Sequence, residues 1–260
     1  MAELQINGVG TIEEIRAAYY NQNALRQPNY RLCQVNIHGQ RFYYDLNGDV
    51  CTFYPSVTTV IRNVAPENRI LNEWRMALGK EAADAFTNER AEYGSMIHGF
   101  LQELLVTRKF YLDEIREKIK TYADYHKLQE GFVDAHEQEA KEDMLAFAKW
   151  MQDYDVQPYA IEVALYHPEY KYAGMIDLVC NMRKYPKGDK HGDERVDAIC
   201  DFKTTRRDFR PEYVWQLEMY RIVWNLWFPD VPIKEIANVR PKDWADFIIH
   251  SLFSQVLWPD

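Results

Sequence analysis

The spacing of apolar residues divides the chain into a helical middle and two strand-rich flanks. Between residues 67 and 155, apolar side chains recur every three or four positions, which is the pattern of amphipathic helices. No proline interrupts the chain between Pro66 and Pro158, and proline is rarely tolerated inside a helix. The predicted helices cover 67–86, 90–106, 112–128 and 135–154.

Outside this region, short runs of β-branched and aromatic residues predict strands. The predicted strands cover 30–46 (two strands of a hairpin), 159–167, 170–182, 196–205 and 231–240. A helix is expected over 211–227, which begins with a proline at a favourable first position. Ser56 is the expected N-cap of the helix that follows it, and a capping box predicts a further helix over 11–21.

This order of elements predicts the fold class. A helical region, three strands, a helix and a final strand are typical of an α/β domain, so we expect one domain over 1–260 with 57–155 as a helical subregion. Its 47% apolar and 27% charged residues exclude a disordered or low-complexity chain. No apolar run approaches the roughly 18 residues of a membrane span, and the first residues lack a signal-peptide pattern. We therefore expect no membrane association and a cytoplasmic location.

Charge and cysteine content narrow the possible ligands and cofactors. The net charge of −9 disfavours general attraction to nucleic acid, so any such binding needs a local basic patch. The four cysteines are Cys33, Cys51, Cys180 and Cys200. They form no CxxC pair and fit neither a zinc site nor an iron–sulfur cluster. Cys180 and Cys200 lie in apolar strand patterns, where we expect buried thiols in a reducing compartment.

Asp201-Phe202-Lys203 ends an apolar strand pattern and is the first candidate for chemistry. Residues two apart on a strand project to the same side, so the Asp201 carboxylate and the Lys203 ammonium should point together. A carboxylate and the Phe202 carbonyl can bind a hard divalent cation, and a nearby ammonium stabilises charge that develops on a phosphate. The alternative is an ordinary salt bridge at the strand end.

Two further acids interrupt apolar strand patterns. Asp177 lies in AGMIDLV, three residues after Gly174, whose missing side chain allows a neighbour to approach closely. Glu162 lies in AIEVA on the preceding predicted strand. Carboxylates gathered on neighbouring strands repel one another unless a cation lies between them, which favours a metal site. The alternative is that Asp177 pairs with an arginine.

Two helical patterns supply further polar candidates. Gly94 and His98 lie one turn apart on a predicted helix. Gln216 and Tyr220 are also one turn apart, on the helix predicted over 211–227. Both side chains can hydrogen-bond phosphate or base edges. Taken alone, His98 also fits a core histidine, and the Gln216 pair also fits an ordinary amphipathic helix.

The order of these motifs resembles the PD-(D/E)XK nuclease superfamily, and its RecB-like branch matches best. The chain presents GxxxH, an acid in a strand, GxxD, DxK and QxxxY in that order between about residues 90 and 225. Upstream, YPSVT at 54–58 followed by a tryptophan-bearing helix is similar to mitochondrial genome maintenance exonuclease and related phage exonucleases. Ile176 stands where the superfamily name places a proline, a common departure in this branch.

This resemblance implies a restriction-endonuclease-like core, in which helices flank a mixed central sheet. It also implies phosphodiester hydrolysis that depends on Mg²⁺, for which Mn²⁺ would substitute, and no iron–sulfur cluster, because the chain lacks the necessary cysteine set. Lys203 would position the attacking water, while Gln216 and Tyr220 would support the site or contact the substrate. The implied catalytic acids and metal ligands are His98, Glu162, Asp177, Asp201 and the Phe202 carbonyl.

The expected substrate is DNA, digested from the free ends of single strands during replication or repair. Residues 201–210 hold four basic residues and two acids, so Arg206 and Arg207 are the expected DNA-binding residues beside the site. Residues 111–145 hold ten acids and five basic residues; we expect a solvated helical face there or, alternatively, a docking surface for a replication or recombination protein.

Three other functions stay open from the sequence. The same chemistry would serve a structure-specific endonuclease. A catalytically inactive module that binds DNA ends or a partner protein is the second alternative, although intact acids and Lys203 argue against it. The third is a globular protein whose strand acids form ordinary buried ion pairs.

Overall fold

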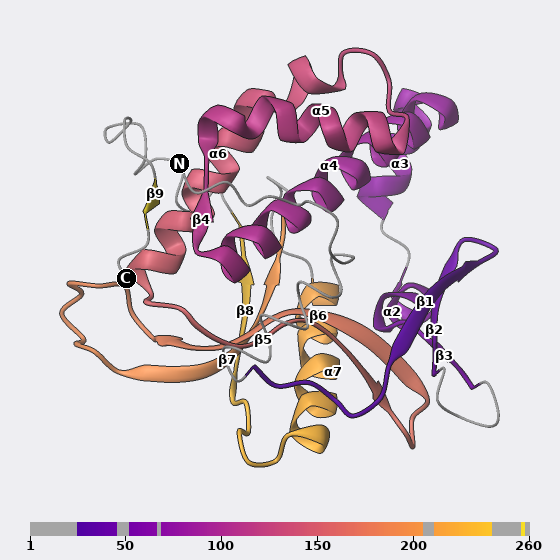
Figure 1. The fold of residues 1–260 in the computed structure, drawn as a ribbon. Coiled ribbons are helices and arrows are strands. Elements are labelled where there is room, and N and C mark those ends of the chain that lie inside the picture. Colours follow the sequence, from indigo (N-terminus) through magenta and orange to yellow (C-terminus); the bar gives the residue numbers. More distant parts are fainter. Residues whose placement is uncertain (1–24, 46–51, 67–68, 205–210, 241–255, 258–260) are drawn as a thin grey trace.

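The computed structural model describes residues 25–45, 52–66, 69–204, 211–240 and 256–257 (Figure 1). The mixed α/β class expected from the sequence is confirmed. The helix predicted over 11–21 lies outside the described residues. Within the described part of the chain, no helix combines the length and apolar character needed to cross a membrane.

A four-stranded sheet lies at the centre of the molecule, in the order β5-β6-β7-β8. Its strands are β5 (Gln157–His167), β6 (Tyr172–Arg183), β7 (Arg195–Phe202) and β8 (Glu235–Val239). β5, β6 and β7 are antiparallel neighbours, whereas β8 runs parallel to β7. A parallel neighbour requires a crossover connection, and helix α7 (Pro211–Trp227) lies within it. The apolar patterns therefore predicted all four strands and the crossover helix correctly.

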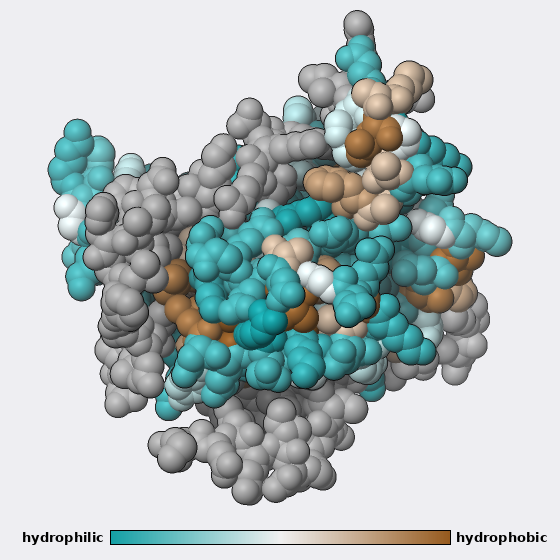
Figure 2. Space-filling model, turned by 90° about the horizontal axis from the view of Figure 1, so that it is seen from above, coloured by the Kyte–Doolittle hydropathy of each residue, from teal (hydrophilic) through white to brown (hydrophobic). Residues whose placement is uncertain are grey.

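Helices lie on both sides of this sheet (Figure 1). α4 (Lys80–Thr107) and α6 (Phe132–Asp153) pack on one face, and α7 lies on the other. The surface over the helices, seen from above, is mostly hydrophilic where it is coloured (Figure 2). The remaining elements of the helical region are α3 (Arg69–Leu78), β4 (Lys109–Phe110), which pairs with β9 (Val256–Leu257), η1 (Leu112–Glu114) and α5 (Ile115–His126).

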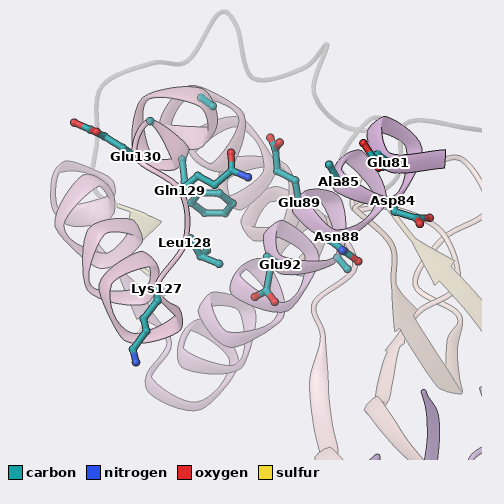
Figure 3. A pocket seen from close by; sticks show the side chains of 14 residues that line it. Glu81, Asp84, Ala85, Asn88, Glu89, Glu92, Lys127, Leu128, Gln129 and Glu130 are labelled. Carbon is teal, nitrogen blue, oxygen red and sulfur yellow. The ribbon is translucent and has the colours of Figure 1, made fainter. Parts of the chain in front are cut away.

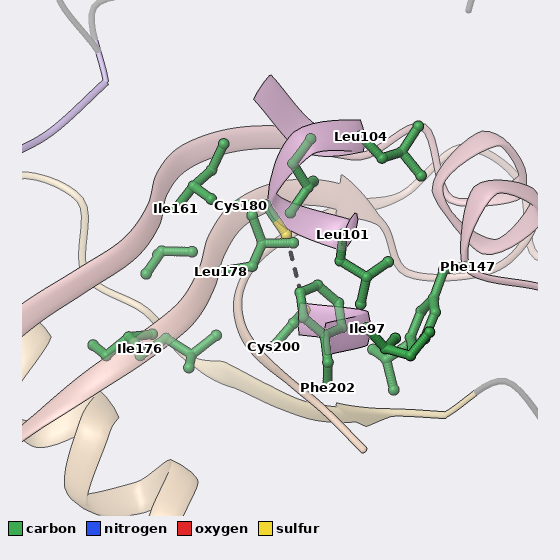
Figure 4. Packing of buried hydrophobic residues seen from close by; sticks show 14 of the residues in the cluster. Ile97, Leu101, Leu104, Phe147, Ile161, Ile176, Leu178, Cys180, Cys200 and Phe202 are labelled. Carbon is green, nitrogen blue, oxygen red and sulfur yellow. Dashed lines mark hydrogen bonds between the residues drawn. The ribbon is translucent and has the colours of Figure 1, made fainter. Parts of the chain in front are cut away.

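Apolar side chains from α4, α6 and the sheet fill the space between them (Figure 4). Ile97 of α4 and Phe202 of β7 both belong to this buried cluster. The Phe202 ring meets Phe147 of α6 edge-on, with 5.4 Å between the ring centroids. Cys180 and Cys200 are buried free thiols in the same layer, as the sequence predicted. This packing holds in place the end of β7 that carries the DxK motif.

A second, three-stranded sheet packs against β6. Its strands are β1 (Leu32–Ile37), β2 (Gln40–Asp45) and β3 (Phe53–Pro55). Helix α2 (Val57–Val64) follows β3. Ser56 caps α2 as predicted, because its hydroxyl accepts the Thr59 N–H at 3.0 Å. Ser56 also forms a β-bridge to Ala173 of β6, and Ala173 is buried with Tyr43 and Tyr54. These contacts tie the N-terminal sheet to the central one.

One helix boundary was predicted wrongly. The sequence pattern placed separate helices over 67–86 and 90–106, but the break lies at Gly79 and α4 runs unbroken past residue 90. Gly79 has a φ of +85°, which only glycine adopts without steric cost and which ends the regular helix. Residues 87–89 are exposed, so their polarity reflects contact with solvent and not a helix end.

Candidate metal centre

Three side chains of metal-ligand type meet from three separate elements. His98 on α4, Glu162 on β5 and Asp177 on β6 each present a ligand atom within 4.8 Å of the other two. Within the described residues, this is the one set of three or more His, Cys, Asp or Glu side chains that meets this condition. The structure therefore brings together three of the residues that the sequence analysis predicted as ligands.

The backbone of β7 connects His98 to Asp177. His98 Nε2 lies 3.0 Å from the Phe202 carbonyl oxygen, which can only accept, so in the neutral ring Nε2 carries the hydrogen. Nδ1 then faces Asp177 Oδ1, 3.7 Å away. Asp177 Oδ2 accepts the Phe202 N–H at 2.8 Å. Metal-binding histidines commonly donate one nitrogen to a carbonyl and present the other to the cation.

Glu162 has an unusual backbone conformation. Its φ is +49° inside β5, although Ile161 and Val163 on either side keep their pairing with β6. For a residue with a side chain, this left-handed region costs about 1–2 kcal/mol. Residues in such strained backbone conformations are common at functional sites, where the surrounding structure holds them in place. Here the conformation accompanies a carboxylate that reaches the cluster.

A second polar group borders this cluster. Lys203 contacts the Asp201 carboxylate, and Gln216 Nε2 donates to Asp201 Oδ1 at 2.9 Å. Lys203 Nζ also donates to Gln216 Oε1 at 3.3 Å, and Gln216 Nε2 lies 3.2 Å from the Tyr220 hydroxyl. The salt bridge considered as an alternative for this motif is therefore present. Asp201 directs its oxygens to Lys203 and Gln216 and stands beside the cluster of three.

Both groups line one cleft of about 620 Å³. The N-terminal sheet adds Gln34 and Arg41 to its lining, and α2 adds Thr58; the sequence analysis predicted none of the three as a site residue. Arg206 and Arg207, predicted to bind DNA, lie outside the described residues. The remaining predicted site residues all line the cleft: His98, Glu162, Asp177, Asp201, Phe202, Lys203, Gln216 and Tyr220.

Burial and neighbouring carboxylate charge together shift the pKa values of Asp201 and His98 in the cleft. Burial raises the pKa of Asp201, and the charge of Asp177 raises it further; the result is about 6, although Lys203 lowers it. Burial lowers the pKa of His98, but the charges of Asp177 and Glu162 outweigh burial and raise it overall. Burial is the larger cause for Asp201, whereas the neighbouring carboxylates are the cause of the raised pKa of His98.

The donor set fits a hard divalent cation. Two carboxylates and one imidazole provide mainly oxygen atoms, which favour Mg²⁺ or Mn²⁺ over softer metals. The Phe202 carbonyl, predicted as a further ligand, instead accepts from His98 Nε2, on the side of the ring away from Asp177. A cation among the three side chains would also offset the repulsion that raises the pKa of Asp201. The residues present therefore suit the metal that the sequence analysis predicted.

A larger pocket of about 910 Å³ lies between the first half of α4 and the turn before α6 (Figure 3). Among the described residues, its acids form no group of three with converging ligand atoms. Their negative charge also repels a phosphate backbone. The charged residues of its lining are Glu81, Asp84, Glu89, Glu92, Glu130 and Lys127. The smaller cleft is therefore the better candidate for chemistry.

Gly174 allows Tyr220 of α7 to pack directly on β6. A methyl group on Gly174 would lie 2.4 Å from Tyr220 Cε1, which is too close without movement of the ring. The glycine of the GxxD motif thus has a physical role. It lets α7 approach the sheet closely enough for Gln216 to reach Asp201.

We expect Gly174→Ala to lower the free energy of unfolding by about 1–3 kcal/mol, because the buried Tyr220 ring has to move. The midpoint of urea unfolding measures this loss. Gly99→Ala is the matched control, since no atom lies within 4 Å of its added methyl group. Alanine there should stabilise α4 by about 0.5–1 kcal/mol. An unchanged midpoint for Gly174→Ala would contradict the close packing of Tyr220.

No protein-family model matches this chain, and no curated protein matches it at a significant level. The residues of the cleft are therefore the basis for assigning a function.

Proposed function

We propose that this protein is a Mg²⁺-dependent deoxyribonuclease of the PD-(D/E)XK type. One observation carries the proposal: His98, Glu162 and Asp177 place ligand atoms within 4.8 Å of one another. The Asp201–Lys203 pair lines the same cleft. Together they supply two parts of a metal-dependent phosphodiester hydrolase, which are a site for a divalent cation and an ammonium that can stabilise charge on phosphate.

The position of the motifs on the sheet supports a restriction-endonuclease-like core. The strand acid lies on β5 and GxxD on β6, and DxK begins on β7 and ends directly after it; these strands are neighbours in the sheet. GxxxH lies on α4, which covers one face, and QxxxY lies on α7, which covers the other. Five motifs that are far apart along the chain thus converge on one cleft.

The alternative of ordinary buried ion pairs fits Asp177 poorly. Its carboxylate oxygens meet the Phe202 N–H at 2.8 Å and the His98 ring at 3.7 Å, and no arginine of the described residues pairs with it. The one described basic group beside it is His98, which is charged only when protonated, and a buried carboxylate that lacks a charged partner is costly. A bound divalent cation removes that cost.

The groups of the cleft have distinct roles in the proposed reaction. A divalent cation held by the cluster would act as a Lewis acid toward a phosphate oxygen. Lys203 Nζ, which also lies 4.7 Å from the centre of the Tyr213 ring, holds the attacking water and stabilises charge on the phosphate. Gln216 keeps Lys203 and Asp201 in position. The water oxygen forms the new P–O bond as the bond to the leaving oxygen breaks; the water gives up one proton to solvent, and the leaving oxygen takes one up from solvent.

We propose further that digestion begins at the free ends of single-stranded DNA. In Mg²⁺, a linear single strand is expected to be degraded, whereas a circular strand of the same sequence resists. Chelation of the cation should stop degradation, because the carboxylates of the cluster then repel the substrate. Gel electrophoresis of 5′- and 3′-labelled strands measures both effects.

The same assay separates the alternatives. Equal cutting of circular and linear strands rejects end dependence and favours the structure-specific endonuclease. If the protein binds DNA but cuts no DNA in Mg²⁺ or Mn²⁺, the inactive binding module is favoured. Cutting that persists after complete chelation would reject a metal-dependent mechanism.

A further inference from the structure

One basic side chain of the cleft, that of Arg41, has no role in the proposed chemistry. Among the described residues, the basic side chains of its lining are Arg41, Arg90 and Lys203. Lys203 contacts Asp201. Arg90 makes a bidentate ion pair with Glu139, in which its two terminal nitrogens lie 2.7 and 3.1 Å from the two carboxylate oxygens. Arg41 is exposed and forms no ion pair with any described residue. Within the described part of the chain, two of these three basic side chains are thus paired with an acid, and Arg41 is not.

The backbone of Arg41 is fixed at the edge of the cleft. Its N–H donates to Thr59 Oγ1 at 3.1 Å, and its carbonyl accepts from the Thr59 hydroxyl at 3.0 Å. The same carbonyl accepts the Ser56 N–H at 2.9 Å. Ser56 is bridged to Ala173 of β6, the strand that carries Asp177. Arg41 therefore enters the cleft from a point tied to the proposed metal centre.

The Arg41 side chain lies on the Glu162 side of the cleft. Burial raises the pKa of the Tyr43 hydroxyl, Arg41 lowers it by its charge and by hydrogen bonding, and the charge of Glu162 raises it, so both side chains act on the same hydroxyl. The Tyr43 hydroxyl in turn donates to Gln34 Oε1 at 3.4 Å, and Gln34 lines the cleft as well. A guanidinium has five N–H donors, and a single hydroxyl occupies few of them. Donors of Arg41 thus remain for a ligand in the cleft.

We propose that Arg41 binds a phosphate of the nucleic-acid strand, adjacent to the phosphate that is cleaved. A guanidinium matches a phosphate with two parallel hydrogen bonds, which fixes the position of the strand. In a chain of net charge −9, a guanidinium that no acid of the described residues neutralises concentrates the attraction for a polyanion at one point. This inference rests on the proposed nuclease function and gives the N-terminal sheet a part in substrate binding.

The test measures the affinity for a short labelled oligodeoxythymidylate by fluorescence anisotropy in Ca²⁺, with gels to confirm that the strand stays intact. Arg41→Ala is expected to raise Kd by about tenfold. It should also lower the slope of log K against log salt by about 0.7, the value for one phosphate contact on a single strand. Arg41→Lys keeps the charge without the planar fork, so it should retain the slope and lose less affinity.

Arg62→Ala is the matched control. Arg62 is an exposed arginine of α2 whose guanidinium donates to the Gly39 carbonyl at 3.4 Å, outside the cleft lining. Its substitution should leave the affinity unchanged; an equal loss in both variants would indicate a general charge effect and overturn the proposal. If Arg41→Ala binds as wild type does while the wild type cleaves DNA, only the inference on Arg41 is overturned. If the wild type binds no oligonucleotide in any divalent cation, the proposed function falls with it.

Discussion

Asp177→Asn is expected to abolish DNA cleavage and to weaken divalent-cation binding by at least about 100-fold. The substitution keeps the size of the side chain but removes one of the two carboxylate charges of the cluster with His98 and Glu162. Calorimetry with Mn²⁺ measures the affinity. The rise in melting temperature with cation concentration provides a second readout that does not depend on activity.

The Asp177→Asn protein should keep its stability in the absence of metal. The charge of Asp177 contributes to the raised pKa of Asp201, so its removal relieves repulsion. The Asn side-chain oxygen can still accept the Phe202 N–H that Asp177 now accepts at 2.8 Å. A melting temperature in chelator at or above that of the wild type therefore distinguishes loss of the site from loss of the fold.

Asp197→Asn is the control for removing a carboxylate from the same sheet. Asp197 on β7 accepts from Asn181 at 2.8 Å and from Tyr159 at 2.9 Å, and it does not line the cleft. Cation binding and cleavage should match the wild type. If Asp177→Asn binds Mn²⁺ as tightly as the wild type does, the cation site lies elsewhere and the proposed function loses its main support.

The acids of the site could be predicted because they interrupt apolar strands. Glu162, Asp177 and Asp201 each follow two apolar residues in a strand, and such a placement is costly unless the charge is paired or coordinated. The same runs of apolar residues also predict the strands. A short stretch of sequence therefore reveals both a strand and the polar residue that breaks its pattern, without knowledge of the fold.

Other features depend on packing between distant segments, which no local pattern reveals. Arg41 reaches the cleft because Ser56 joins the N-terminal sheet to β6. Glu162 takes its left-handed conformation inside a strand whose sequence gives no turn signal. Asp201 was predicted as a metal ligand, yet its oxygens face Lys203 and Gln216, because α7 brings Gln216 to within 2.9 Å of it.

Lys203→Met is expected to lower kcat for DNA cleavage by about 10²–10³-fold and to leave cation affinity close to that of the wild type. Lys203 lies outside the cluster of ligands, so its loss should affect the chemical step and not metal binding. Methionine still covers the Tyr213 ring, which lies 4.7 Å from Nζ. Lys203 lowers the pKa of Asp201, so in the variant this buried carboxyl more readily takes up a proton, which limits the cost to stability. Single-turnover kinetics at saturating Mg²⁺ measures the loss.

Lys184→Met is the control for removing a lysine from an ion pair. Lys184, in the turn after β6, lies 3.1 Å from Glu194, and neither residue lines the cleft. The Lys184→Met protein should cleave as the wild type does. A wild-type rate in Lys203→Met would remove the catalytic role of Lys203, even if Asp177→Asn had confirmed the metal centre. Loss of cation binding in Lys203→Met would point to a different role, in which the ammonium acts only by holding Asp201 in place beside the cluster. The kinetic and calorimetric results together therefore decide whether Lys203 serves the chemical step or the architecture of the site.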